Sequence, residues 1–357
     1  MSLSSKEPPS TVEEGSATTF TAVHPDILQS HILTRLDGPT LASASCVSSQ
    51  LHALSAQDHL WTDICHSTWP STSTPRLRQV ISTFPDGARS FFAHAFPILV
   101  TDPTNNSPLN LDRSSTSSPS EIISAVDIYY QDKLIFTKVQ ETETVTGWFR
   151  CSPFRIDLLD HKDVVPTRLQ HPDGDETCMA LAEEMTLSWI VIDPIGRRAM
   201  NLSSYKPVSV QRHWLSGEVQ VRFASILAGD HKRSASEFVQ CGIVVTCSGS
   251  EGGKMLVREV YLQVEDMDGM HLKGKESLVI LQRALEGKRR RVGRTRREEE
   301  GRTRFSKHIG KPAIFDEKNE EYAWNRCREI WIHRYPSEQF ENECDSDEVR
   351  DAYAITN

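Results

Sequence analysis

The sequence predicts an α+β protein, in which three short helices near the N-terminus precede a β-rich antiparallel sandwich or barrel-like domain that ends in one helix. Two observations support this prediction. Apolar residues recur at helical spacing within residues 23–65, whereas from about residue 122 the pattern is that of short strands. A polar stretch over residues 101–120 separates the two patterns, and a chain of 357 residues commonly holds two domains.

Three short helical segments are predicted within residues 23–65, each with its own start signal. Pro25 suits the opening turn of the first segment because a proline has no N–H to leave unpaired. The sequence DGP at residues 37–39 interrupts the helical spacing, and its proline opens the second segment. Leu60 and Trp61 belong to the third. Helices this short cannot bury all of their apolar side chains among themselves, so the module is expected to bind a partner.

In order and spacing these residues resemble an F-box, a small helical module that docks on the Skp-type adaptor of a cullin ubiquitin ligase. The family pattern opens with an apolar residue, a proline and an Ile-Leu pair, and it closes with a Leu-Trp step and an apolar-Cys step. Two positions depart from it, because Ser48 replaces a cysteine and Leu51 replaces a tryptophan. The matching residues are Val23, Pro25, Ile27, Leu28, Ile32, Leu33, Leu36, Leu41, Val47, Leu60, Trp61, Ile64 and Cys65.

Longer segments, such as HPDILQSHILTRLDGPTLASASCVSSQLH and WLSGEVQVRF, are similar to a plant F-box subgroup from about Val23 to Gly287. The resemblance implies a non-catalytic substrate receptor. Such a receptor binds the Skp-type adaptor, and through it a cullin, and brings a protein target close to a ubiquitin-loaded enzyme. An ordinary helical cap on a larger domain is the alternative for the helices. The adaptor-binding residues that the resemblance implies are Pro25, Ile27, Leu28, Ile32, Leu33, Leu36, Leu41, Val47, Leu51, Leu54, Leu60, Trp61 and Ile64.

Composition and charge narrow the remaining functional classes. The net charge of −9 gives no general attraction to nucleic acid or to an anionic membrane. No apolar run reaches the roughly 18 residues that a membrane span requires, and the N-terminus lacks the apolar core of a signal peptide. The eight cysteines include no pair with zinc-site spacing. We therefore expect a protein of the cytoplasm, the nucleus or both, with no metal and no cofactor.

Polar and charged segments are expected to separate the folded parts of the chain. The basic residues of 288–304 indicate a nuclear-localisation signal or a nucleic-acid patch, and the adjacent Glu298–Glu300 argue against the patch. A solvated helix extension is the further alternative. In chain order we expect a disordered segment at 1–22, the F-box at 23–66, a helical extension at 67–100, a polar linker at 101–120, a β-rich substrate-binding domain at 121–287, the basic segment at 288–304, and an acidic tail at 305–357 in which no family pattern is recognised.

About eight antiparallel strands are predicted in the β-rich domain. In residues 217–227 polar and apolar side chains alternate, so one face of that strand is predicted to be wet and the other buried. The predicted strands are 123–130, 133–139, a segment led by 147–150, 185–193, 197–202, 217–227, 237–247 and 255–265, and the predicted helices outside the F-box are 75–80, 86–96 and 274–286.

Catalysis is not indicated by the sequence, because it shows no glycine-rich phosphate loop, nucleophile elbow or paired-carboxylate motif. Trp148, Trp189 and Trp214 are candidate residues of a substrate groove, although core packing is the commoner fate of such side chains. The alternative function is a β-rich protein that binds a carbohydrate or a small ligand and has no ligase role.

Overall fold

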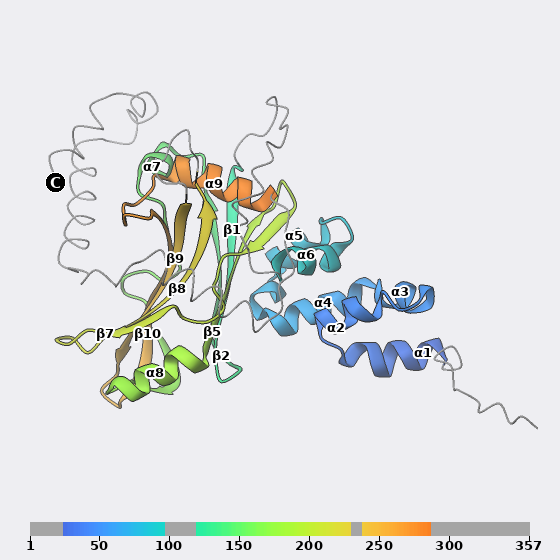
Figure 1. Cartoon of the computed structure of the whole chain (residues 1–357), viewed down its shortest axis with the longest axis horizontal. Coiled ribbons are helices and arrows are strands. Elements are labelled where there is room, and N and C mark those ends of the chain that lie inside the picture. The colour runs from blue at the N-terminus through green and yellow to red at the C-terminus, as the bar shows by residue number, and fades with distance from the viewer. Residues whose placement is uncertain (1–23, 97–118, 230–237, 287–357) are drawn as a thin grey trace, which may run out of the picture. The chain divides into compact units, whose positions relative to one another are not determined.

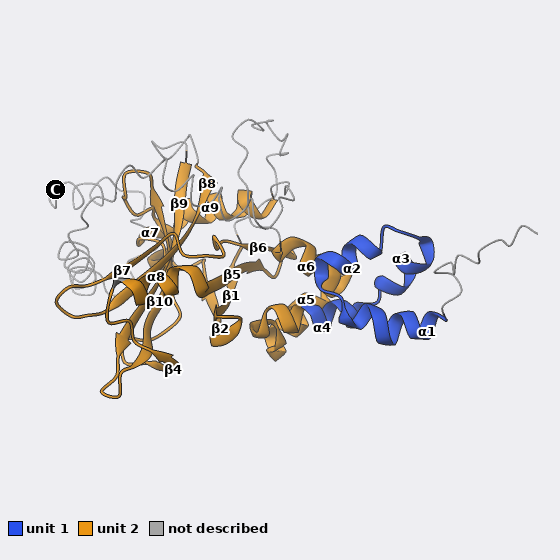
Figure 2. Ribbon diagram, turned by 60° about the horizontal axis from the view of Figure 1, so that its bottom comes forward, with its two compact units in different colours: residues 1–64 blue, residues 65–357 orange. Residues whose placement is uncertain are grey.

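The computed structural model describes residues 24–96, 119–229 and 238–286 (Figure 1). The segment expected to be disordered, most of the expected linker, the basic segment and the acidic tail lie outside the described residues. The chain divides into two compact units, residues 1–64 and residues 65–357 (Figure 2). The second unit therefore begins within the predicted F-box and includes the predicted helical extension.

The first unit consists of short helices, as predicted, but the second predicted helix is divided. Ser48 adopts an extended conformation, and its hydroxyl accepts a hydrogen bond from the backbone N–H of Leu51 at 3.2 Å, so a new helix begins there. Asp37 caps the preceding helix through Thr40 N–H at 2.9 Å. The elements are α1 Pro25–Ile27, the π-helix η2 Leu28–Ile32, the 3₁₀ helix η3 Leu33–Arg35, α2 Gly38–Ala44, α3 Ser49–Ser55 and α4 Asp58–Thr68, which continues into the second unit.

The helical part of the second unit follows α4 and comprises η4 Pro70–Ser73, α5 Pro75–Ser82 and α6 Gly87–Ala95. Both predicted helices of the extension are present, and each differs from its predicted bounds by one or two residues. Aromatic side chains hold these helices together. The rings of Trp69 and Phe92 lie 5.3 Å apart, and the rings of Phe84 and Phe91 meet edge to face at 5.6 Å.

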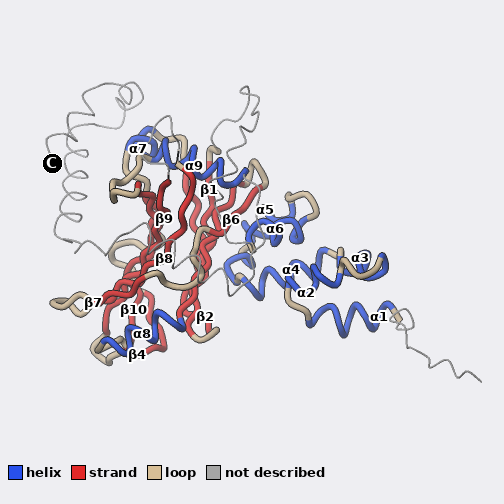
Figure 3. The backbone as a smooth tube through the Cα atoms, viewed as in Figure 1, coloured by secondary structure: helices blue, strands red, loops and turns tan. Residues whose placement is uncertain are grey.

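Two antiparallel sheets form the rest of the second unit (Figure 3). The four-stranded sheet has the order β2-β1-β5-β6. The second sheet has the order β3-β10-β9-β8-β7, and β4 also pairs with β10. The strands are β1 Glu121–Tyr130, β2 Lys133–Glu143, β3 Arg155–Asp157, β4 Val165–Gln170, β5 Met185–Asp193, β6 Arg198–Asn201, β7 Ser209–Arg212, β8 Val219–Ala228, β9 Phe238–Gly249 and β10 Lys254–Asp266.

This architecture confirms the predicted α+β class with antiparallel sheets and a C-terminal helix, α9 Gly274–Glu286. The prediction that residues 147–150 lead directly into the third strand is wrong. They form the helix α7 Gly147–Cys151, and the third strand starts only at Arg155. Thr146 caps that helix through Phe149 N–H at 3.3 Å. The strands β4 and β7 and the helix α8 Asp175–Glu184 were not predicted.

One apolar core lies between the two sheets. Trp189 from the four-stranded sheet and Phe223 and Val245 from the other belong to it, and all three are fully buried. Helix α9 contributes Leu278 and Leu281. The two sheets therefore form a sandwich that this helix closes on one side.

Candidate functional site

Three large apolar side chains of the F-box segment are exposed to solvent. Ile27 ends α1, Ile32 ends η2, and Val47 lies in the turn between α2 and α3. Their exposed fractions are 49%, 37% and 74%. Pro25, at the start of α1, is exposed as well. We define these four residues as the exposed apolar set. Within the first unit they are the side chains from the predicted adaptor-binding residues that are most available to a partner.

The other predicted adaptor-binding residues are mostly enclosed. Leu28 and Leu33 face inward from the first helical stretch, each only 1% exposed. The Trp61 indole N–H donates a hydrogen bond to the carbonyl of Ser55 at 2.7 Å. These side chains hold the helices together in the chain on its own, and their contact with the adaptor stays a prediction. The buried members are Leu28, Leu33, Leu41, Leu51, Leu60, Trp61 and Ile64, whereas Leu36 and Leu54 are half-buried.

The three tryptophans predicted to line a substrate groove lie in different environments. Trp189 is fully buried, and its indole N–H donates to the hydroxyl of Ser124 at 3.1 Å, so its assignment to a groove is corrected to a core role. Trp148 lies on α7 and is 45% exposed. Trp214 lies in the β7–β8 turn, far from α7 in Figure 1, so the two do not share one site.

The β7–β8 turn presents an apolar pair on a well-ordered backbone. Trp214 is 83% exposed and Leu215 is 73% exposed. The backbone N–H groups of Ser216 and Gly217 donate to His213, to its Nδ1 at 3.0 Å and to its carbonyl at 2.9 Å. Gly217 has a φ of +70°, a conformation that L side chains rarely adopt. The pair is therefore held outward by a specific turn, and it is a candidate contact surface.

A buried carboxylate joins η4 to the four-stranded sheet. Asp127 on β1 is fully buried, and its two oxygens accept three hydrogen bonds. The donors are Ser71 N–H at 2.9 Å, the Ser71 hydroxyl at 2.5 Å and the Thr137 hydroxyl at 2.7 Å. Burial raises the pKa of Asp127, and the hydrogen bonds from Ser71 and Thr137 oppose this shift.

Further polar contacts tie the helical extension to the same sheet. The Trp69 indole N–H donates to the hydroxyl of Ser188 on β5 at 3.3 Å. Arg76 on α5 forms ion pairs with Glu121 at 3.2 Å and Glu141 at 3.4 Å, and these hydrogen bonds and charges raise the pKa of its guanidinium. The extension is therefore a structural part of the β-rich unit.

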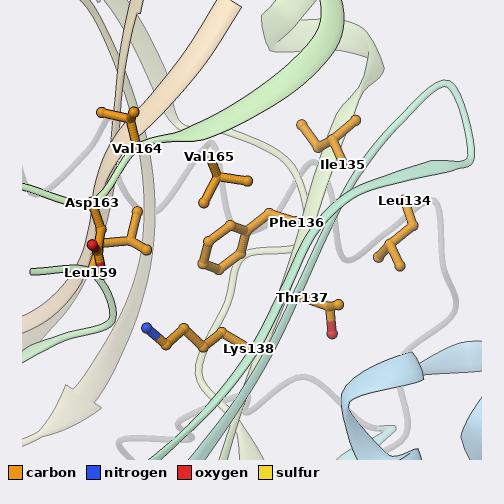
Figure 4. Close-up of a pocket in the computed structure, with 9 residues that line it drawn as sticks. All are labelled: Leu134, Ile135, Phe136, Thr137, Lys138, Leu159, Asp163, Val164 and Val165. Atoms are coloured by element: carbon orange, nitrogen blue, oxygen red, sulfur yellow. The ribbon is translucent and has the colours of Figure 1, made fainter.

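A shallow pocket of about 500 Å³ opens beside β2 (Figure 4). Phe136 and Lys138 extend from the strand toward Leu159 and Val165 on the far wall. The walls are mainly apolar, and their charged groups are the Lys138 ammonium and the Asp163 carboxylate. The lining residues are Leu134, Ile135, Phe136, Thr137, Lys138, Leu159, Asp163, Val164 and Val165.

The described residues contain no cluster of three or more His, Cys, Asp or Glu side chains that could hold a metal ion. Cys46, Cys241 and Cys247 are free thiols. Burial raises the pKa of Cys241 and Cys247 to about 12, which keeps both protonated near neutral pH. None of the described helices is long and apolar enough to cross a membrane.

Comparison with known families identifies the helical segment. The F-box-like family model matches residues 25–67, which cover the exposed apolar set and the buried residues beneath it. One relative, described as a probable F-box protein of Arabidopsis thaliana, is 48% identical over 82% of each chain. The chain belongs to the F-box proteins. A general role as a non-catalytic substrate receptor of Skp–cullin–F-box ligases, bound to a Skp-type adaptor, follows from this membership.

Two further F-box proteins of Arabidopsis thaliana extend the similarity beyond the F-box. One is 45% identical over 90% of this F-box protein and 88% of its own length. The other is 44% identical over 78% of this F-box protein and 82% of its own length. Both sheets of the β-rich unit therefore lie within the shared region. No solved structure matches the chain.

The C-terminal segment matches a second family that the sequence analysis did not recognise. Residues 298–356 match the model of glycine-rich domain-containing protein-like sequences. They contain two glycines, so glycine content could not have indicated the match. This F-box protein thus carries a segment similar to another family that begins within its basic segment.

Proposed function

We propose that this protein docks on the Skp-type adaptor through the exposed apolar set, Pro25, Ile27, Ile32 and Val47, and that its β-rich unit recruits a protein target for ubiquitination. The exposure of these side chains is the observation that supports the proposal. Large apolar groups on a folded module lower the free energy of association when a partner removes them from water. Recruitment raises the concentration of target lysines around the ubiquitin-loaded enzyme, and the receptor itself needs no catalytic group.

Replacing Ile27 and Ile32 together by aspartate is expected to abolish co-purification with the adaptor. Each isoleucine is partly exposed, and the adaptor is predicted to bury the exposed part. This burial stabilises the complex by about 1–1.5 kcal/mol per side chain. The loss of both would weaken the complex by about two decades, and two carboxylates placed in an apolar interface would weaken it further. A pull-down with purified adaptor, together with a circular-dichroism spectrum of the variant, measures both binding and fold.

Two control variants separate binding from folding. Ile195→Asp makes the same change at a 69% exposed isoleucine in the β5–β6 turn, and it should leave adaptor binding unchanged. Leu28→Ala removes a buried side chain, so it should lower the melting temperature of the helical module, at a cost of about 2–5 kcal/mol. Full adaptor binding by a folded Ile27→Asp, Ile32→Asp variant would contradict the proposed docking surface.

The basic segment is proposed to direct the protein to the nucleus. Replacing Arg289, Arg290 and Arg291 by alanine is expected to shift the protein, fused to a large tag, toward the cytoplasm. The large tag is needed because a chain of 40.3 kDa can pass nuclear pores without a signal. Fluorescence microscopy of the tagged protein measures the shift, and an unchanged nuclear fraction would favour a solvated helix extension instead.

A further inference from the structure

The edge strand β2 presents an unpaired backbone edge. It spans 11 residues, and among the described residues it pairs with β1 on one side and with no strand on the other. Such an edge offers backbone N–H and C=O groups to an added strand. The other edge strands are shorter, with 4 residues in β6, 4 in β7, 3 in β3 and 6 in β4. β2 is thus the longest edge that the described residues provide.

The charges of β2 leave one four-residue segment, residues 134–137, without a charged side chain. Proteins protect sheet edges by placing charged side chains along them. In β2 the charged residues are Lys133, Lys138 at the middle of the strand, Glu141 and Glu143, and the segment 134–137 between the two lysines reads Leu-Ile-Phe-Thr. Leu134 is 41% exposed. The β1–β2 ladder shifts register within this segment, where Phe136 pairs with Ile128 and Leu134 pairs with Tyr129, so the regular part of the edge runs from Phe136 through Lys138.

The pocket beside this segment provides a place for side chains of such a peptide. Phe136 and Lys138 point to the same face of β2, because side chains two residues apart in a strand share a face. Leu159 and Val165 form the opposite wall. Lys138 is half-buried at this pocket, and its ammonium forms no ion pair with another described residue. An apolar side chain and a carboxylate would complement the pocket.

We propose that β2 accepts an extended segment of the ligase target as an additional antiparallel strand. The antiparallel direction follows the sheet, in which every described ladder is antiparallel. In that direction an acidic residue opposite Lys138 precedes an apolar residue opposite Phe136 by two positions. The recognised element is therefore acid-x-apolar in an extended chain. This inference rests on the function proposed above and gives it a substrate class.

A designed peptide tests the inference on the full chain bound to the adaptor. The probe is the fluorescein-labelled peptide Thr-Thr-Glu-Thr-Leu-Thr-Ile-Thr-Thr, and fluorescence anisotropy measures its dissociation constant. Its Glu and Leu would lie opposite Lys138 and Phe136, and its Ile would lie beside the register shift between Leu134 and Phe136. Lys138→Glu is expected to weaken binding by about threefold to tenfold, since a cross-strand attraction becomes a repulsion. The same peptide with Lys in place of Glu should show the opposite preference for the two proteins.

Backbone methylation distinguishes strand addition from simple pocket filling. Alternate amides of an added strand face β2, and the remaining amides face solvent. Two versions of the peptide, N-methylated on one or the other alternate set, carry the same side chains. Strand addition predicts that one version loses binding and the other retains it. This comparison uses the unaltered protein, so it does not depend on the folding of a variant.

Each other outcome overturns the inference. Equal binding of the two methylated peptides would show that the pocket takes side chains without strand addition, and no binding of any peptide would show that this edge does not accept such a segment. A dimer in light scattering that excess peptide does not dissociate would assign the edge to a second copy of the chain. Two cross-checks separate this inference from the proposed function. The Lys138→Glu variant should still co-purify with the adaptor, and the Ile27→Asp, Ile32→Asp variant should still bind the peptide, so a failure of one proposal leaves the test of the other intact.

Discussion

A fragment of residues 119–286 is expected to show no cooperative thermal transition, whereas a fragment of residues 65–286 should melt cooperatively with a sheet-dominated circular-dichroism spectrum. The sequence alone predicts residues 121–287 as the β-rich domain, but the compact unit begins at residue 65. The reason lies on the face of the four-stranded sheet that points away from the sandwich core.

That outer face is apolar and fully buried. Ile123 on β1 and Ile190 and Ile192 on β5 are each 0% exposed, although none belongs to the core between the sheets. The helix α6 lies against β6, and η4 lies against β1 and β2. Removing this cover would expose the three isoleucines at a cost of about 5–9 kcal/mol. This cost is comparable to the whole stability of a typical domain, about 5–15 kcal/mol.

The fragment comparison has a direct internal control. Both fragments contain every strand of the two sheets, so they differ in the helical cover and in the segment that joins it to β1. If the fragment of residues 119–286 melts cooperatively at the temperature of the longer one, the helical extension does not stabilise the sheet.

Replacing Asp127 by alanine in the full chain is expected to lower the free energy of unfolding by about 2–4 kcal/mol. The substitution leaves three donors without their acceptor, two from the buried Ser71 and one from Thr137. Chemical denaturation at neutral pH measures the change. Asp157→Ala, at an exposed carboxylate paired with Arg155 on the short strand β3, is the matched control and should change the stability by less than about 0.5 kcal/mol.

Asp127→Asn separates the charge of this site from its hydrogen bonds. Because the pKa of Asp127 is raised in the folded state, the folded protein binds more protons than the unfolded chain between the ordinary and the raised pKa. The contribution of Asp127 to the free energy of unfolding is therefore greatest at a pH below the ordinary pKa of an aspartate. It is lost as the pH rises through the pKa that Asp127 has in the folded protein. The asparagine variant lacks this dependence, so its stability relative to the unaltered protein should increase as the pH rises through that window. A constant difference across the window would contradict the raised pKa.

The two parts of the candidate site differ in how far local sequence could predict them. The F-box was recognisable from the spacing of apolar residues and prolines, which a single helix or turn largely determines. Whether Leu28 or Ile32 is exposed depends on how the helices pack, and the π-helical turn of η2 changes which face each residue occupies. The sequence therefore predicted the module and the set of apolar positions, but it could not separate core residues from docking residues.

The sequence by itself determined the α+β class, the order of the main elements and the family, because helical and strand periodicities and turn residues are local properties. The tertiary structure decided where the helical extension belongs and which tryptophan is core and which is exposed. It further decided that the Asp127 carboxylate on β1 accepts hydrogen bonds from the 3₁₀ helix η4, 56 residues earlier in the chain. It also decided that β2 is an edge. These features depend on strand order and on long-range packing, which a pattern of neighbouring residues does not specify.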